Sequence, residues 1–127
     1  MSWDFDNGIP IYLQIMDKIK MKIISGELSA SERLDSVRDL AQQSGVNPNT
    51  MQRAMAELER EGLIYSERTA GRFVSSDSDM INSLRQSMAE SKIRLLLSAL
   101  CDLGYDKACI ADMVNENIKA MKGEEYE

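Results

Sequence analysis

One segment in the middle of the chain constrains the fold more than any other. Ser36 and Asp39 form the S-x-x-D pattern of a helix start, in which the serine oxygen accepts from a backbone N–H of the first turn. Gly45 predicts the end of that helix, because glycine enters the left-handed conformation without steric cost. Asn47 and Pro48 predict the cap and first residue of a second helix. The segment therefore predicts two helices joined by a tight turn.

The second of these helices has one apolar and one polar face. Met51, Met55 and Leu58 recur at helical spacing. The other side and its flanks carry Asn49, Thr50, Gln52 and Arg53. A helix-turn-helix uses such a surface, at the start of a helix after a tight turn, to present side chains to base edges and backbone amides to phosphates. The alternative is an ordinary amphipathic helix with a solvated outer face.

A hairpin is predicted directly after this helix. Leu63–Tyr65 opens a strand, Glu67–Gly71 forms the tip, and Arg72–Val74 returns, with Phe73 expected to point inward onto the helices. Arg68 and Arg72 flank the tip, where a hairpin can reach phosphates or the minor groove; solvated hairpin charges are the alternative. The expected fold is mainly α with a small β-hairpin, a winged helix-turn-helix.

These phrases together resemble the winged-helix DNA-binding domain of the GntR family of bacterial transcription regulators. The resemblance covers residues 9–75 and is carried, in this order, by PIYLQI, SVRDLA, GVNPNT, AMAELEREGLI and GRFV. With its short tail, the chain is similar to the YtrA-like branch, whose members are small dimeric repressors. The resemblance implies that Arg38 lies at a position used against DNA, and that a transporter operon is the expected genetic context.

The chain departs from the family pattern at two places. Where relatives often have P-G-E-R-L-P-S, this chain has Ala30, Ser31 and Asp35 in place of the two prolines and the glycine. At the wing, the usual G-x-G reads Thr69-Ala70-Gly71, without the first glycine. Loss of proline loosens φ and loss of glycine restricts the available turns, so the contacts of the wing are the part of the resemblance most affected.

Composition excludes several classes of function. The chain has 127 residues, no histidine and only two cysteines, Cys101 and Cys109. Without histidine, no serine–histidine or cysteine–histidine catalytic arrangement can form, and zinc has few candidate ligands. No apolar run approaches the roughly 18 residues of a membrane span, and the charged N-terminus does not resemble a signal peptide. We expect a cytoplasmic protein that is not an enzyme, with no metal, cofactor or membrane partner.

The net charge of −6 opposes binding to DNA, whose backbone repels acidic protein. The acid is unevenly distributed, because residues 76–127 carry ten acidic and six basic side chains, whereas residues 31–75 carry seven and six. Arg38, Arg53 and the wing arginines can therefore still converge on one face. The expected result is a modest basic patch with weak non-specific binding.

Before this segment, an aromatic arm and one amphipathic helix are predicted. Trp3 and Phe5 are expected to dock on the domain or on a partner subunit, with a disordered arm as the alternative. Pro10 starts a helix whose apolar positions are Tyr12, Ile15, Met16, Ile19 and Ile23. The lysines of its other side, Lys18, Lys20 and Lys22, are read as a solvated face in preference to phosphate ligands. A connecting loop, Glu27–Arg33, follows.

After a polar boundary, residues 76–127 are predicted to form a two-helix dimerisation tail, separate from the winged domain at 1–75. Its first helix ends at Gly104, and Asp106 caps the second, whose apolar face is Ile110, Met113, Val114 and Met121. The stripe on the first helix contains Ile81, Leu84, Met88, Leu95 and Leu96. Two such helices expose more apolar surface than they can bury against each other, and a contiguous exposed patch usually marks an interface.

The sequence therefore predicts a homodimeric, sequence-specific DNA-binding regulator, of the repressor kind, on a pseudo-palindromic double-stranded operator. Two recognition helices would enter successive major grooves about 34 Å apart. The residues expected at the DNA are Arg53, Asn49 and Thr50, then Asn47 and Gln52, together with Arg38, Arg68, Gly71 and Arg72. Two alternatives stay open: a small-molecule sensor with an effector pocket among the tail helices, and a winged-helix module that binds protein.

Overall fold

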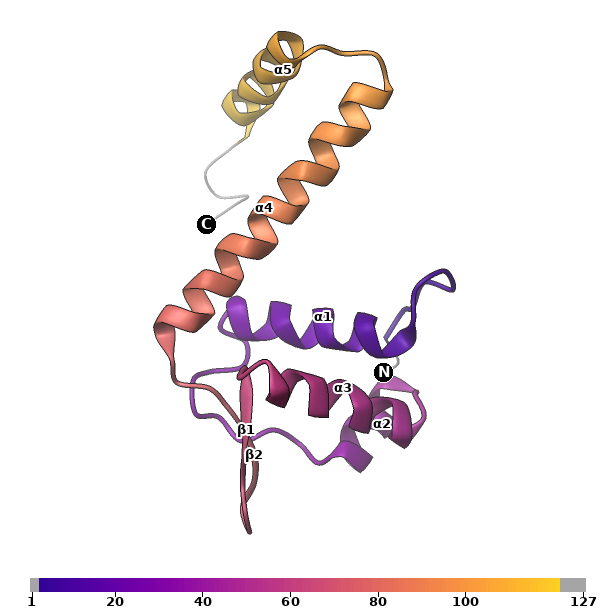
Figure 1. The fold of residues 1–127 in the computed structure, drawn as a ribbon, viewed down its shortest axis with the longest axis vertical. Helices are drawn as coiled ribbons and strands as arrows, with labels where there is room; N and C mark the ends of the chain where they lie inside the picture. Colours follow the sequence, from indigo (N-terminus) through magenta and orange to yellow (C-terminus); the bar gives the residue numbers. More distant parts are fainter. Residues whose placement is uncertain (1–2, 122–127) are drawn as a thin grey trace. The chain divides into compact units, whose positions relative to one another are not determined.

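Five helices and one two-stranded hairpin follow one another in the computed structural model, which describes residues 3–121 (Figure 1). The elements are α1 (Ile11–Ile24), α2 (Val37–Ser44), α3 (Pro48–Arg60), β1 (Ile64–Glu67), β2 (Gly71–Val74), α4 (Ser78–Asp102) and α5 (Lys107–Ala120). The predicted fold class, mainly helical with a small hairpin, is confirmed. The extreme ends of the two predicted domains, at residues 1–2 and 122–127, lie outside the described residues.

The chain forms two compact units that divide between Arg85 and Gln86. The polar stretch after residue 75 predicted an earlier boundary. The difference arises at the start of α4, where Ile81 and Leu84 are half-buried against the core of the N-terminal unit. Helical spacing reveals an apolar stripe but not which surface covers it. These two residues, predicted at a dimer interface, thus pack within their own unit.

The core of the N-terminal unit lies between α1, α3 and the inner face of the hairpin. Ile15 of α1 and both Met51 and Leu58 of α3 are fully buried. Among the apolar positions predicted for α1, four are buried and Tyr12 is half-buried, so the predicted face of this helix is confirmed. α3 also packs against α2 and β1, which makes it the central element of this unit.

Local capping fixes the turn between α2 and α3 as the sequence predicted. The Ser36 side chain accepts a hydrogen bond from the Asp39 N–H at 3.1 Å. Gly45 has φ +74° and donates its N–H to the Ala41 carbonyl at 2.9 Å. Asn47 Oδ1 accepts from the Asn49 N–H at 2.7 Å, with Pro48 as the first residue of α3.

The hairpin is antiparallel, and its register decides which side chains face the helices. Ile64 pairs with Val74, and both are buried. Their neighbours Tyr65 and Phe73 therefore lie on the other face, where their rings stack with centroids 5.7 Å apart. The prediction that Phe73 points inward is wrong, because Val74 occupies the inward position and successive strand residues alternate.

A third extended segment runs along the outer edge of β2, where the sequence predicted only a loop. The Leu34 N–H donates to the Arg72 carbonyl at 2.8 Å, and the Val74 N–H donates to the Glu32 carbonyl at 2.9 Å. Between these bonds, Arg33 and Phe73 form an antiparallel bridge. Residues 31–34 thus belong to the wing.

The C-terminal unit consists of the rest of α4 and of α5. Gly104 has φ +98° where α4 ends, and Asp106 Oδ1 accepts from the Cys109 N–H at 2.8 Å, as the sequence predicted. That backbone hydrogen bond lowers the pKa of Asp106 below its ordinary value. Ile110 is buried, whereas Leu95 and Leu103 are each 72% exposed.

Candidate nucleic-acid interface

The start of α3 presents polar side chains to solvent. Asn49, Gln52 and Arg53 are exposed and Thr50 is half-buried, while Met51 is fully buried on the other side of the helix. Because the helix begins at Pro48, its first backbone N–H groups are at this same end. Amide, hydroxyl and guanidinium donors are thereby combined with the positive end of a helix dipole.

Arg53 contacts an aromatic ring of the neighbouring helix α1. Its guanidinium carbon lies 3.7 Å from the centroid of the Tyr12 ring on α1, a cation–π contact. Together with the start of α1, these residues border a hollow of about 580 Å³, lined by Pro10, Ile11, Tyr12, Asn49, Thr50 and Arg53. The sequence identified Tyr12 only as an apolar position, because helical spacing does not show that a ring at the edge of the core can hold an arginine.

Two further predicted contacts flank the start of α3. Arg38 is exposed in the first turn of α2. Asn47 is exposed too, but its Oδ1 already serves as the helix cap. The two N–H donors of Nδ2 and the second lone pair of Oδ1 are what this side chain offers a ligand.

The two predicted wing arginines have different surroundings. Arg68 is exposed at the tip, next to the turn that ends at Gly71 with φ +105°. Arg72 is half-buried, and its Nε donates to Glu59 Oε1 of α3 at 3.2 Å. Ser66 donates to the same oxygen at 2.9 Å. The structure therefore places Arg68 and Gly71 at the tip and directs Arg72 back toward α3.

Sequence reasoning missed one cation at the wing. Arg33, on the extended segment beside β2, is exposed and donates its Nε–H to the Ala70 carbonyl in the turn at 2.8 Å. The sequence carried two signals: Arg33 matches the arginine of the family pattern P-G-E-R-L-P-S, and Leu34 is apolar between charged neighbours, as on a half-buried strand. The alternation is too short to predict a strand by itself, and the match to the family pattern does not place the arginine beside the wing.

The acidic residues late in α3 are matched by nearby cations. Glu57 binds Arg60 at 2.6 Å, and Glu61 binds Lys20 of α1 at 3.0 Å. The hydrogen bond to Glu57 raises the pKa of Arg60 above its ordinary value. Local pairing thus reduces the negative field of this end of the helix, away from the polar start of α3.

Two of the α1 lysines contact the aromatic rings of the N-terminal arm. Lys22 lies 5.1 Å from the centre of the Trp3 ring and Lys18 lies 5.9 Å from that of Phe5. Both aromatic side chains pack against the core. The arm thus docks on its own domain, one of the two docking surfaces that the sequence allowed.

The described part of the chain contains neither a cluster of metal ligands nor a membrane-spanning helix. Within residues 3–121, His, Cys, Asp and Glu side chains form no group of three that could hold a metal ion. In the same residues, no helix is both long enough and apolar enough to cross a membrane.

A helical core with a capped turn before α3, and a hairpin after it, defines a winged helix-turn-helix domain. Residues 11–74 match the family described as "Bacterial regulatory proteins, gntR family". The chain belongs to this GntR family and resembles its YtrA-like branch. It is accordingly a DNA-binding transcription regulator and not an enzyme.

Two relatives from Bacillus subtilis extend the match into the tail. The uncharacterized HTH-type transcriptional regulator YhcF is 34% identical over 107 residues, which are 84% of this chain and 88% of YhcF. The HTH-type transcriptional repressor YtrA is 34% identical over 100 residues, 79% of this chain and 72% of YtrA.

Solved structures of transcription regulators are also similar to this chain. A GntR family transcriptional regulator from Listeria monocytogenes superimposes with a TM-score of 0.81 and 38% identity, over 88% of this chain and 98% of that one. The DNA-binding domain of AraR, in complex with operator ORR3, has a TM-score of 0.51 and 29% identity, over 59% of this chain and 88% of that one.

Proposed function

We propose that this protein is a homodimeric transcription repressor that binds a pseudo-palindromic operator, with one α3 in each of two successive major grooves. The observation that carries the proposal is the exposed, donor-rich start of α3, where Arg53 is braced on Tyr12. Two comparisons support it, since the relative YtrA is named a repressor and the AraR domain is bound to an operator. Such a function is carried out in the cytoplasm.

Each predicted contact takes a role from its position. Arg53, Asn49 and Thr50 contact base edges or the adjacent phosphates, since they lie at the end of α3 that a major groove admits. Asn47 and Gln52 contribute from the flanks of the same turn. Arg38 binds phosphate from α2. At the wing, Arg68 and Gly71 meet the DNA backbone, whereas Arg72 keeps the hairpin against α3 through Glu59.

The proposed dimer forms through the C-terminal unit. There Leu95 is 72%, Ile118 57% and Leu96 49% exposed, although monomeric proteins rarely expose large contiguous apolar patches. A second copy is a fitting occupant, because a two-fold interface buries the same patch of both subunits. Met88 stays in this proposed interface, and Ile81 and Leu84 leave it because they are half-buried against the core of their own unit.

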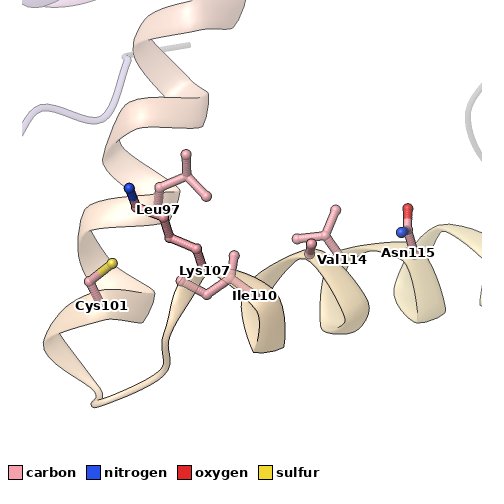
Figure 2. Close-up of a pocket in the computed structure, with 7 residues that line it drawn as sticks. Leu97, Cys101, Lys107, Ile110, Val114 and Asn115 are labelled. Atoms are coloured by element: carbon pink, nitrogen blue, oxygen red, sulfur yellow. The ribbon is translucent and has the colours of Figure 1, made fainter.

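One observation favours a second role for the tail as an effector sensor. Figure 2 shows a largely apolar groove between the end of α4 and α5, bordered by the polar ends of Lys107 and Asn115. Its volume is about 480 Å³, within the roughly 300–1,000 Å³ of ligand pockets. A small molecule bound there would change the pairing of the tails and hence DNA binding.

Following the YtrA-like branch, we propose a neighbouring transporter-type operon as the regulated target.

The reading surface is tested with DNA enriched from a random pool by the full chain. Arg53→Ala and Asn49→Ala should each weaken binding by about 1–3 kcal/mol, because each removes a contact to a base edge or phosphate. Arg60→Ala is the matched control, since it removes the same charge from the exposed far end of the same helix. Equal effects of Arg53→Ala and Arg60→Ala, with unfolding unchanged, would contradict a reading role for the start of α3.

A further inference from the structure

We infer that Arg33 is a DNA-contacting cation of the wing and that it also holds the wing turn in shape. This inference rests on the proposed function and adds a residue that the helix-turn-helix and hairpin patterns do not contain. Arg33 takes the place of Arg72 as the second wing arginine, beside Arg68, at the DNA backbone.

The backbone of Arg33 is fixed beside the hairpin. Bonds from the Leu34 N–H to the Arg72 carbonyl, and from the Val74 N–H to the Glu32 carbonyl, hold the residues on either side of it at 2.8 and 2.9 Å. Arg33 itself is bridged to Phe73. Its side chain therefore starts from a rigid strand-like edge, which lowers the entropy lost when it binds a ligand.

The side chain lies across the wing turn. Nε donates to the Ala70 carbonyl at 2.8 Å, and a Cβ added at Gly71 would lie only 3.1 Å from Nε and 3.5 Å from Nη2. The guanidinium therefore packs against the α-carbon of Gly71, where its approach and the φ of +105° both favour glycine. In this chain an arginine secures the turn that lacks the first glycine of the family pattern.

The arginine keeps donors for a phosphate. Guanidinium carries five N–H groups, and the bond to Ala70 uses the one on Nε. Arg33 is exposed, and within the described residues no carboxylate lies within 4.0 Å of it. Arg72, in contrast, is half-buried and paired with Glu59, so binding phosphate would require breaking that pair. On this wing, Arg33 and Arg68 are the cations available to the DNA backbone.

Binding of the full chain to its enriched DNA, measured over a range of salt concentrations, tests the inference. For Arg33→Ala, the slope of log affinity against log salt should become shallower by about 1.8, because each of the two subunits on the operator loses one phosphate contact worth about 0.9. Arg33→Lys keeps the charge and should keep the slope. It cannot reproduce the bond from Nε to Ala70, so exchange of the wing amides should accelerate in both variants.

The possible outcomes separate this inference from the proposed function. An Arg33→Ala protein with the wild-type slope overturns the contact, while a loss of binding in Arg53→Ala would leave the proposed function standing. Unchanged wing amide exchange in both Arg33 variants overturns the role in the turn. A wild-type protein that shows no salt-dependent binding to any enriched DNA overturns both proposals. Thermal unfolding confirms that each variant is folded.

Discussion

Tyr12 and Arg53 show how a single residue on α1 can tune the surface that reads DNA. A guanidinium 3.7 Å from the ring centre is held in one direction, although both residues lie at the edge of the domain. An exposed cation–π contact contributes about 0.5–1 kcal/mol. The same ring also covers part of the core, so its two roles can be separated by substitution.

We predict that Tyr12→Leu weakens operator binding by on the order of 1 kcal/mol, because Arg53 loses the ring that orients it. Tyr12→Phe keeps the ring and should bind nearly as well as the wild type. Affinity measurements together with thermal unfolding distinguish orientation from loss of fold. Equal binding by Leu and Phe variants of equal stability would show that the ring does not prepare Arg53.

The backbone of Ser31 is strained. It has φ +64°, a left-handed conformation that costs a non-glycine residue roughly 1–2 kcal/mol, and it stands where the family pattern has glycine. Ser31→Gly should therefore raise the free energy of unfolding by up to about 1 kcal/mol, after the extra freedom of glycine in the unfolded chain is counted.

Urea unfolding of Ser31→Gly and of Ser29→Gly checks this prediction. Ser29 is an exposed serine in the same segment and does not have positive φ, so its replacement should bring no gain. A stability increase of equal size at both positions would argue against strain at Ser31.

At the scale of elements, the sequence predicts what is local. Ser36, Gly45, Asn47 and Asp106 act at helix ends through neighbours two to four residues away, and each takes its predicted place. The prediction for Phe73 was wrong because which residues of a strand face the core depends on the strands it pairs with, here β1 and the extended segment at Arg33.

The candidate site divides in the same way. The exposed face of α3 follows from helical periodicity, so Asn49, Gln52 and Arg53 could be placed from the sequence. The contacts of Tyr12 with Arg53 and of Arg33 with Ala70 could not be predicted, because they join residues 41 and 37 positions apart in the chain. The boundary between the units was also out of reach, because periodicity does not show which surface covers the start of α4.

The cap of α5 gives a prediction for pH. The folded pKa of Asp106 is lowered, so its stabilising contribution is present above the ordinary carboxyl pKa and is lost as pH falls through the folded value. Helix content should fall over that acidic range in the wild type. Asp106→Asn keeps an uncharged cap, so the helix content of its α5 should not show this loss at acidic pH. Identical curves of helix content against pH for the two proteins would contradict a role of the Asp106 carboxylate.

At the scale of the whole molecule, an acidic chain can bind DNA because its cations are unevenly placed. The carboxylates of Glu57, Glu59 and Glu61 are each paired within the domain. The few arginines that remain for phosphates predict weak binding by one domain. Joining two domains makes the second engagement effectively intramolecular and raises affinity without any new contact.

The proposed dimer is tested by Leu95→Lys, which places a charge in an apolar position that is 72% exposed. Sedimentation should shift toward monomer and operator affinity should fall, while the fold is kept. Glu90→Gln changes the net charge by the same amount on the other side of α4, five residues away, and should leave assembly unchanged. A wild-type chain that is monomeric at micromolar concentration would contradict the dimer directly.

In the proposed complex, two α3 helices read one operator together. Selection of preferred DNA from a random pool by the full chain tests whether they do. We expect enrichment of an inverted repeat whose half-site centres are about 10 base pairs, or a multiple of that, apart. Enrichment of a single unpaired half-site, or of no sequence at all, would contradict it.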